Sequence, residues 1–138
     1  MMNSNLPKAP EAIGNYVTFK KAENLIFTSG HIPVGENNFY GKIPSQVNVE
    51  DGYKASSYCA ELTIATLSKN FEIEKLQPLN VVGFINSDFD FKDHAKVLNG
   101  FTDKLSEYFT EKATRSAVGV QSLPLNVCVE VQCIFLHE

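Results

Sequence analysis

Two short runs near the start of the chain, residues 16–20 and 25–29, are rich in the β-branched and aromatic residues of extended strands. The four residues between them are mostly polar or charged, so the pattern predicts a hairpin with a four-residue loop. Residues 30–47 show no hydrophobic period and contain many Gly, Pro and Asn residues. We expect this segment to be a long loop.

The segment that begins at Asn48 has the apolar spacing of an amphipathic helix. Asn48 is the expected N-cap, and Glu50 and Asp51 place carboxylates in the first turn, where they offset the helix dipole. Apolar side chains then recur every three or four positions and predict a broad buried stripe. The stripe comprises Ala55, Cys59, Ala60, Leu62, Ile64, Leu67 and Phe71.

A second helix is expected to begin near Asp90. Phe89, just before it, is expected to contact His94 in the manner of a hydrophobic staple. The apolar positions of this segment step by four and three residues, which is the spacing of one helical face. That face comprises His94, Leu98, Phe101, Leu105 and Tyr108.

Apolar runs at residues 79–85, 115–121 and 127–136 predict three further strands, the last two joined as a second hairpin across residues 122–126. The resulting order is ββαβαββ. It favours an α+β fold with one mostly antiparallel sheet and two helices packed on one face. A chain of 138 residues, 43% of them hydrophobic, can bury a core of its own, so residues 1–138 are expected to form a single domain.

The composition argues against several classes of protein. No stretch approaches the roughly 18 apolar residues of a membrane span, and the first ten residues lack the apolar core of a secretory signal. We therefore expect a soluble, cytoplasmic protein with no membrane partner. The formal net charge is −4 and the longest basic run is the pair Lys20 and Lys21, which disfavours a nucleic-acid partner.

The chain contains three cysteines, Cys59, Cys128 and Cys133. An odd number of cysteines in a chain of this length fits a reducing compartment, so we interpret them as thiols. Cys128 and Cys133 are five residues apart in an expected strand and should point to opposite faces, where they cannot share a metal. The three histidines have no ligand spacing either. No metal site is predicted.

Two charged residues are candidates for chemistry. Arg115 is the only arginine against eleven lysines, and its planar guanidinium can hold a carboxylate through two parallel hydrogen bonds. The alternative is an ordinary surface arginine at a strand end. Glu130 lies in an otherwise apolar strand, so its carboxylate must be paired, hydrated or directed into a cleft, because burying it alone is unfavourable.

Segments that together cover most of residues 10–131 resemble the Rid family, also called the YjgF-like or endoribonuclease L-PSP family. The matching segments read AIGNYV (12–17), LIFTSGHIP (25–33), VLNG (97–100), RSAVGV (115–120), LPLN (123–126) and VEV (129–131). The segments GNYV (14–17), DGY (51–53), RSAVGV (115–120) and LPLN (123–126) resemble one branch of the family in particular, whose natural substrate is less settled than that of the founding members. The resemblance implies a chorismate-mutase-like fold and a homotrimer whose sheets line a central barrel. It also implies three ligand clefts between subunits, with no cofactor.

The resemblance also assigns roles to residues. Arg115 would hold the substrate carboxylate and Glu130 would orient or activate a water, while Tyr16, Ser29 and Asn99 would line the cleft. Each of these three also has an ordinary structural interpretation, as a strand residue or as part of a solvated helix face. Two positions depart from the best-known members. Ala117 stands where many of them carry Cys, so no thiol nucleophile is implied there, although the position still lines the proposed substrate site. His31 stands where they carry Gln; it could tune binding by titrating, or it could be a hydrogen-bonded turn residue.

Three functions are compatible with these residues. The leading hypothesis is cofactor-free hydrolysis of 2-imino and enamine acids to 2-oxo acids and ammonia, a reaction in which positioning supplies most of the catalysis. The second is a non-catalytic trimer that binds small carboxylic acids or ketoacids in the same clefts. The third, endoribonuclease activity on single-stranded RNA, has little support because the net charge is negative. The first two require a small-molecule partner with a carboxylate.

Overall fold

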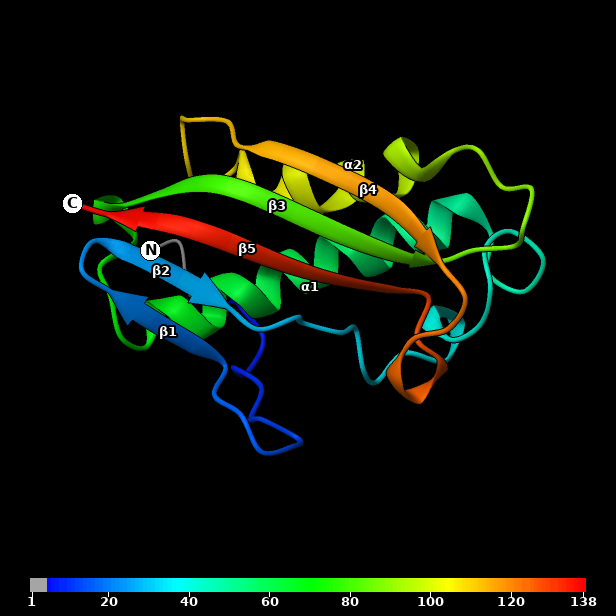
Figure 1. Ribbon diagram of the computed structural model, residues 1–138, viewed down its shortest axis with the longest axis horizontal. Helices are drawn as coiled ribbons and strands as arrows, with labels where there is room; N and C mark the ends of the chain where they lie inside the picture. The colour runs from blue at the N-terminus through cyan, green and yellow to red at the C-terminus, as the bar shows by residue number, and fades with distance from the viewer. Residues whose placement is uncertain (1–4) are drawn as a thin grey trace.

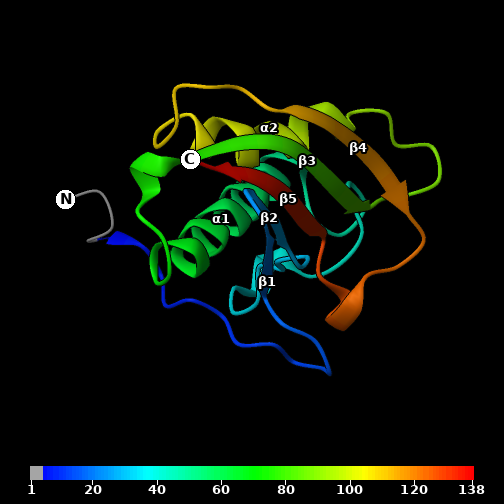
Figure 2. The same cartoon turned by 60° about the vertical axis from the view of Figure 1, so that its left-hand side comes forward.

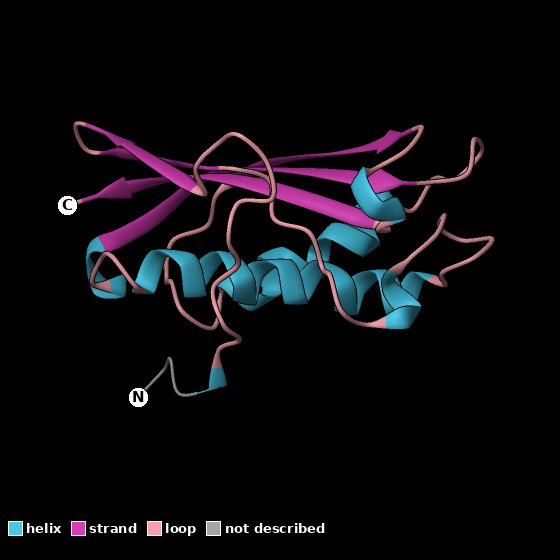
Figure 3. Cartoon of the chain, turned by 90° about the horizontal axis from the view of Figure 1, so that it is seen from below, coloured by secondary structure: helices cyan, strands magenta, loops and turns pink. Residues whose placement is uncertain are grey.

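The computed structural model describes residues 5–138. Within them, one five-stranded sheet is covered on a single face by two α-helices, as the edge view in Figure 3 shows. The strands are β1 (Phe19–Ala22), β2 (Leu25–Thr28), β3 (Leu76–Asn86), β4 (Thr114–Val120) and β5 (Val129–His137), and the helices are α1 (Val49–Ser68) and α2 (His94–Leu105). The predicted α+β class and the ββαβαββ order are confirmed.

The strand order across the sheet is β1-β2-β5-β3-β4, with β3 and β4 parallel and the other neighbours antiparallel (Figure 1). The sheet is therefore mostly antiparallel, as predicted. The expected hairpin between the last two strands is wrong, because β3 lies between them. Strands β3 and β4 run parallel through the α2 crossover, so β4 takes one side of β3 and leaves the other side for β5.

The first hairpin forms, but with a shorter loop than expected. Ala22 pairs with Leu25, which leaves the two-residue turn Glu23 and Asn24. Glu23 has a φ of 55°, the left-handed backbone that tight hairpin turns require. Because β1 begins at Phe19, Tyr16 lies outside the sheet, in the segment before it. Figure 2 shows this segment (blue) running outside the helix layer before the chain enters β1.

Helix α1 begins as the sequence predicts. The Asn48 side-chain oxygen accepts the backbone N–H of Asp51 at 2.7 Å, and Glu50 and Asp51 lie in the first turn. Its buried residues include most of the predicted stripe, although Phe71 lies beyond the end of the helix. The cap satisfies a terminal N–H that the helix itself cannot pair.

Helix α2 begins at His94, four residues later than expected, and the predicted contact between Phe89 and His94 is wrong. The N–H of Phe91 donates to the carbonyl of Asp88 and turns the chain there. As a result Phe91 packs on His94, with ring centroids 5.1 Å apart, and Phe89 is fully exposed. Tyr108 follows the end of the helix.

The two faces of the sheet differ in what covers them. Towards the helices, fully buried side chains such as Ile85, Leu98, Phe101 and Phe135 form the core. On the opposite face Phe27 is 42% exposed and Val118 is 44% exposed. Figure 3 shows no helix on that side. The molecule thus presents one sheet face with apolar side chains and no covering layer among residues 5–138.

Candidate functional site

Tyr16 and Ser29 share a pocket of about 330 Å³. It lies where the segment before β1, the loop after β2 and helix α1 meet. The Ser29 hydroxyl donates to the carbonyl of Val17 at 2.5 Å, and the Tyr16 hydroxyl accepts the N–H of Ile13 at 3.3 Å. The structure therefore brings these two predicted residues together. The remaining wall is largely apolar and includes Ile32, Val34, Tyr58, Leu62 and Leu125.

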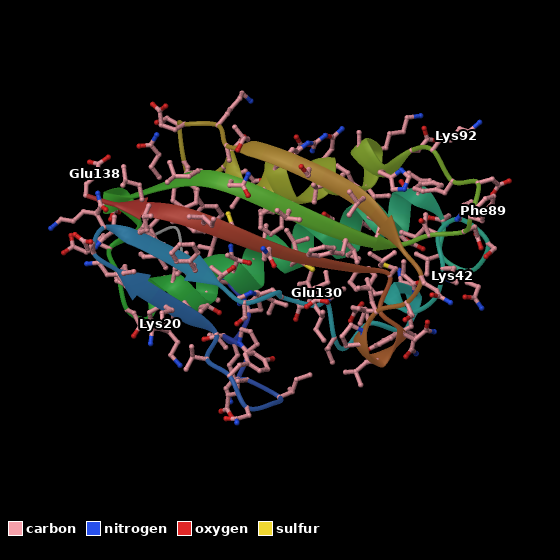
Figure 4. All side chains as sticks on the ribbon, viewed as in Figure 1. Lys20, Lys42, Phe89, Lys92, Glu130 and Glu138 are labelled. Atoms are coloured by element: carbon pink, nitrogen blue, oxygen red, sulfur yellow. The ribbon has the colours of Figure 1, made fainter. Side chains whose placement is uncertain are left out.

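Glu130, on β5, lies directly over the backbone of Gly30, which lines the same pocket. A Cβ at position 30 would collide with the Glu130 carboxyl, so glycine is what leaves room for it. Figure 4 shows Glu130 near the middle of the molecule. The carboxyl is half-buried, and burial raises its pKa because it disfavours the charged form. Among the described residues it has no hydrogen bond or ion pair, so both oxygens are open to water or a ligand.

His31 fixes the loop that carries Ser29 and Gly30. Its ring Nδ1 is 3.0 Å from the Ser29 carbonyl, and Nε2 is 2.9 Å from the hydroxyl of Thr66 on α1. A carbonyl only accepts, so Nδ1 carries the proton and Nε2 accepts from Thr66. The side chain is 3% exposed, and burial lowers its pKa, opposed by the hydrogen bond to Ser29. His31 is thus a hydrogen-bonded turn residue behind the pocket.

Arg115 and Asn99 lie together in a second pocket, of about 300 Å³, between β4 and α2. The Arg115 Nη1 donates to the hydroxyl of Thr102 at 3.1 Å. No carboxylate lies within 4.0 Å of the guanidinium in the described part of the chain. Since the guanidinium has five donors, most of them are free for a ligand. Asn99 is exposed on the helix surface and lines the same pocket as the guanidinium.

Ala117 follows Arg115 on β4 and is partly buried against the core. Alternate residues of a strand share one face, so Ala117 is on the same side of the strand as Arg115.

Within one chain the two groups of residues are not brought together. Arg115 pairs with buried Val81, so its side chain is on the helix side of the sheet, where it bonds Thr102. Glu130 pairs with Phe84 and alternates with buried neighbours on β5, so its side chain is on the other side. Within one chain Arg115 and Glu130 therefore lie on opposite sides of the sheet.

The cysteines do not form a site. All three are buried free thiols, and burial raises the pKa of Cys128 to about 12 and raises that of Cys59 well above its usual value. The expectation that Cys128 and Cys133 point to opposite faces is wrong. Cys128 precedes β5, outside the regular alternation, and both side chains lie in the core. Among residues 5–138 no group of three potential metal ligands occurs, and no helix is long and apolar enough to span a membrane.

Some residues of these pockets were not singled out from the sequence. Thr102, which bonds Arg115, lies one helical turn after Asn99. The predicted helix already places these two side chains next to each other. Gly30 was part of a matching segment but received no role of its own. Tyr58 and Leu62 belong to α1 and reach the Tyr16 pocket only through tertiary packing, so no local signal marks them.

The fold and these two pockets define a small α+β domain with clefts of the size that takes small molecules. The sequence model of the endoribonuclease L-PSP family matches residues 6–136. The chain belongs to this family, which is also called the Rid or YjgF-like family.

Among curated relatives, 2-iminobutanoate/2-iminopropanoate deaminase from Escherichia coli is 30% identical over 135 residues, which cover 94% of this chain and 93% of the relative. A solved protein of unknown function from Agrobacterium tumefaciens is 29% identical with a TM-score of 0.87, covering 96% of this chain and 86% of that one. TdcF from Escherichia coli, solved with bound serine, is 26% identical with a TM-score of 0.68, covering 95% and 94%. The backbone is thus closer to the Agrobacterium protein than to TdcF.

Proposed function

We propose that this protein hydrolyses reactive 2-imino and enamine acids to 2-oxo acids and ammonia, in clefts between the subunits of a homotrimer. One observation carries the proposal. The chain displays a guanidinium without a carboxylate partner and a half-buried carboxyl without a cationic partner, on opposite sides of its sheet. The relative named 2-iminobutanoate/2-iminopropanoate deaminase supports this reaction.

Arg115 would bind the substrate carboxylate. A guanidinium can present two parallel N–H groups to a carboxylate, and such charge-assisted pairs fix orientation as well as affinity. Thr102 takes one donor and holds the guanidinium on the surface of α2 beside Asn99. The solved TdcF with bound serine supports a ligand of amino-acid size in this family.

Glu130 would act on the water. In its ionised form the carboxylate accepts a proton from a water as the water oxygen bonds to the imine carbon, and the electron pair of the C=N bond moves to nitrogen. Glu130 returns that proton to the nitrogen, and the hydroxyl proton of the adduct also passes to the nitrogen as the C–N bond breaks. Ammonia then leaves and the C=O bond of the 2-oxo acid forms. Ser29 and Tyr16, held by their own backbone contacts, would line the cleft beside the carboxyl of Glu130. Every atom comes from the imine and one water, so no cofactor is required.

The second candidate is a non-catalytic binder of small carboxylic acids or ketoacids in the same clefts. Ala117 and the close backbone match to a protein of unknown function favour it. Endoribonuclease activity, which the family description names, has no comparable support, because Arg115 has no basic neighbours other than Lys112 in its pocket.

Imine lifetime tests the proposal directly. Threonine and a threonine dehydratase generate 2-iminobutyrate, which semicarbazide traps, and the protein is added as wild type or Arg115→Lys. Wild type should shorten the imine lifetime, and the variant should be about 10- to 100-fold less active, since losing a bidentate charged pair costs about 1.5–3 kcal/mol. Lys96→Met is the matched control: it removes a positive charge from the exposed surface of α2, outside the pocket, and should retain activity.

The alternatives predict different results. If wild-type protein leaves the imine lifetime unchanged but binds 2-oxobutyrate with an affinity that Arg115→Lys abolishes, the non-catalytic role replaces the proposal. Cleavage of single-stranded RNA by a nuclease-free preparation, lost in Arg115→Ala, would support the ribonuclease instead.

A further inference from the structure

A third cavity, of about 580 Å³, lies away from the Tyr16 pocket and the Arg115 pocket. It is formed where β3 and β4 end, between the loop before α1 and the start of α2. Its lining includes Lys42, Ser87, Phe89, Phe91, His94 and Gly119. Figure 4 shows Lys42 and Phe89 at one end of the molecule, whereas Glu130 lies near its middle. The volume is within the range of pockets that bind small molecules.

Lys42 brings to this cavity a positive charge that has no ion-pair partner among residues 5–138. Its ammonium donates to the side-chain oxygen of Asn86 at 2.9 Å and to the carbonyl of Gln121 at 2.6 Å. Both acceptors are neutral, and no carboxylate of residues 5–138 lies within 4.0 Å of the ammonium. Asn86 is 1% exposed, and its amide N–H group donates to the carbonyl of Val127 at 3.2 Å, which turns the oxygen towards Lys42. The ammonium is thus held in place with its third donor unused.

Ser87 and His94 point at the same spot. A Cβ at Gly119 would collide with the Ser87 hydroxyl and would lie 2.9 Å from the His94 Nε2. Neither polar atom has a hydrogen-bond partner within the described range, and Phe91 holds the His94 ring with centroids 5.1 Å apart. Gly119 therefore keeps open a space that two unpaired polar groups border.

Asp88 also lines the cavity, but its carboxylate is engaged elsewhere. One oxygen accepts the Ser45 N–H at 2.8 Å and the other accepts the Ser45 hydroxyl at 2.9 Å. Asp93, just before α2, pairs with Lys96 at 3.9 Å. Neither carboxylate of this part of the chain lies within 4.0 Å of the Lys42 ammonium, and both oxygens of Asp88 face Ser45.

The remaining wall is aromatic. Phe89 is fully exposed at the cavity, and Phe91 is half-buried beside it. A flat apolar ligand would remove the exposed surface of Phe89 from water, and this burial favours binding. From these contacts we propose that the cavity binds a small oxyanion, a carboxylate or a phosphate, carried on a flat apolar group. Lys42, Ser87 and His94 would hold the anion, and the two phenylalanines would cover the apolar part.

Amide NMR titrations of the full-length protein in its native assembly test this proposal, with phenyl phosphate and phenylacetate as probes. Phenylacetamide lacks the charge and acetate lacks the apolar group, so both should bind at least tenfold more weakly. Saturable shifts at Ser87 and Gly119 with either charged probe support the site, and the stronger probe identifies the anion. The absence of saturable shifts with both probes would overturn it.

Variants separate this cavity from the Arg115 site. Lys42→Met and Ser87→Ala should each weaken probe binding, Lys42→Met by at least tenfold, and Gly119→Ala should abolish it by filling the space. Ser87→Ala keeps the test valid if Lys42→Met, which also loses two internal hydrogen bonds, fails to fold. Lys92→Met removes a nearby charge that does not line the cavity and should change nothing. Binding that survives Ser87→Ala and Gly119→Ala but is lost in Arg115→Lys would place the probe elsewhere and overturn the proposal.

Discussion

Glu130 holds its carboxyl in a half-buried position without a cationic partner among the described residues. Burial raises its pKa, so the folded protein binds this proton more tightly than the unfolded chain does. Stability from this group is therefore fully present below the unfolded pKa, near 4.3, and is lost as the pH rises through the folded pKa. Ionised Glu130 therefore lowers the free energy of unfolding at neutral pH.

Replacing Glu130 with Gln should remove this destabilising effect of the ionised carboxylate. Glu130→Gln should melt at a higher temperature than wild type at pH 7. The difference should shrink towards zero at about pH 3, below the unfolded pKa, where Glu130 is protonated in both the folded and the unfolded state. Thermal unfolding followed by circular dichroism at the two pH values measures this. Glu72→Gln, at an exposed glutamate, should show no such pattern. Equal melting temperatures of Glu130→Gln and wild type at pH 7 would contradict the account.

His31 should make the protein sensitive to mild acid. Its pKa is lowered by burial, so the unfolded chain takes up the proton first as the pH falls below about 6.5, and stability is lost over that range. His31→Gln keeps an amide that can bond Ser29 and Thr66 but does not titrate. The variant should lose less stability than wild type between pH 7 and pH 5 in urea titrations. His137→Gln, which leaves His31 in place, should lose as much as wild type does.

At the scale of the elements, the two helices depend on one close approach. At Gly100 of α2 a Cβ would collide with the backbone carbonyl of Tyr53 on α1. Backbone cannot move aside as a flexible side chain can, so the helices must separate if position 100 gains a methyl group. Only glycine allows this spacing.

Gly100→Ala should therefore destabilise the protein by about 1–3 kcal/mol. Helix propensity alone predicts the reverse, a gain of about 1 kcal/mol for alanine over glycine. The sign of the change in the free energy of unfolding therefore shows whether the collision or the propensity dominates. Urea unfolding measures it. Ala95→Gly, at an exposed position of the same helix, should cost about 1 kcal/mol through propensity alone. A stabilised Gly100→Ala would mean that the helices adjust freely.

The helices and strands could be predicted from the sequence better than the pairing of the strands in the sheet. The caps and spacing that predict helices are local, and Asn48 caps α1 as expected. Strand pairing is not local: nothing in residues 115–121 says whether that strand pairs with β5 or with β3. For the same reason Arg115 and Glu130 could be singled out as candidates, whereas their placement on opposite sides of the sheet could not be predicted.

At the scale of the whole molecule, two features fit the expected homotrimer whose sheets face one another. One is the uncovered sheet face, and the other is the placement of Arg115 and Glu130 on opposite sides of the sheet. The exposed apolar side chains of that face, Phe27 and Val118, would then be buried by other copies of the chain. The same assembly would bring Arg115 of one copy towards Glu130 of the next.

Val118→Asp should break this assembly, because it would place a carboxylate in an apolar interface. We expect light scattering after gel filtration to show a trimer for wild type and a monomer for the variant, with imine hydrolysis lost together with the trimer. Phe89→Asp adds the same charge at an exposed phenylalanine off the sheet and should remain trimeric. An active monomeric Val118→Asp would refute the shared cleft.

The separation of Arg115 from Glu130 within a chain has a genetic consequence. Subunits carrying Arg115→Lys and subunits carrying Glu130→Gln are each defective, yet a mixed trimer of the two kinds would contain one cleft with both residues intact. Co-expression of the two weakened variants should therefore restore part of the activity, whereas a chain carrying both changes would rescue neither. Loss-of-function alleles at these two positions would complement each other, although they affect a single gene.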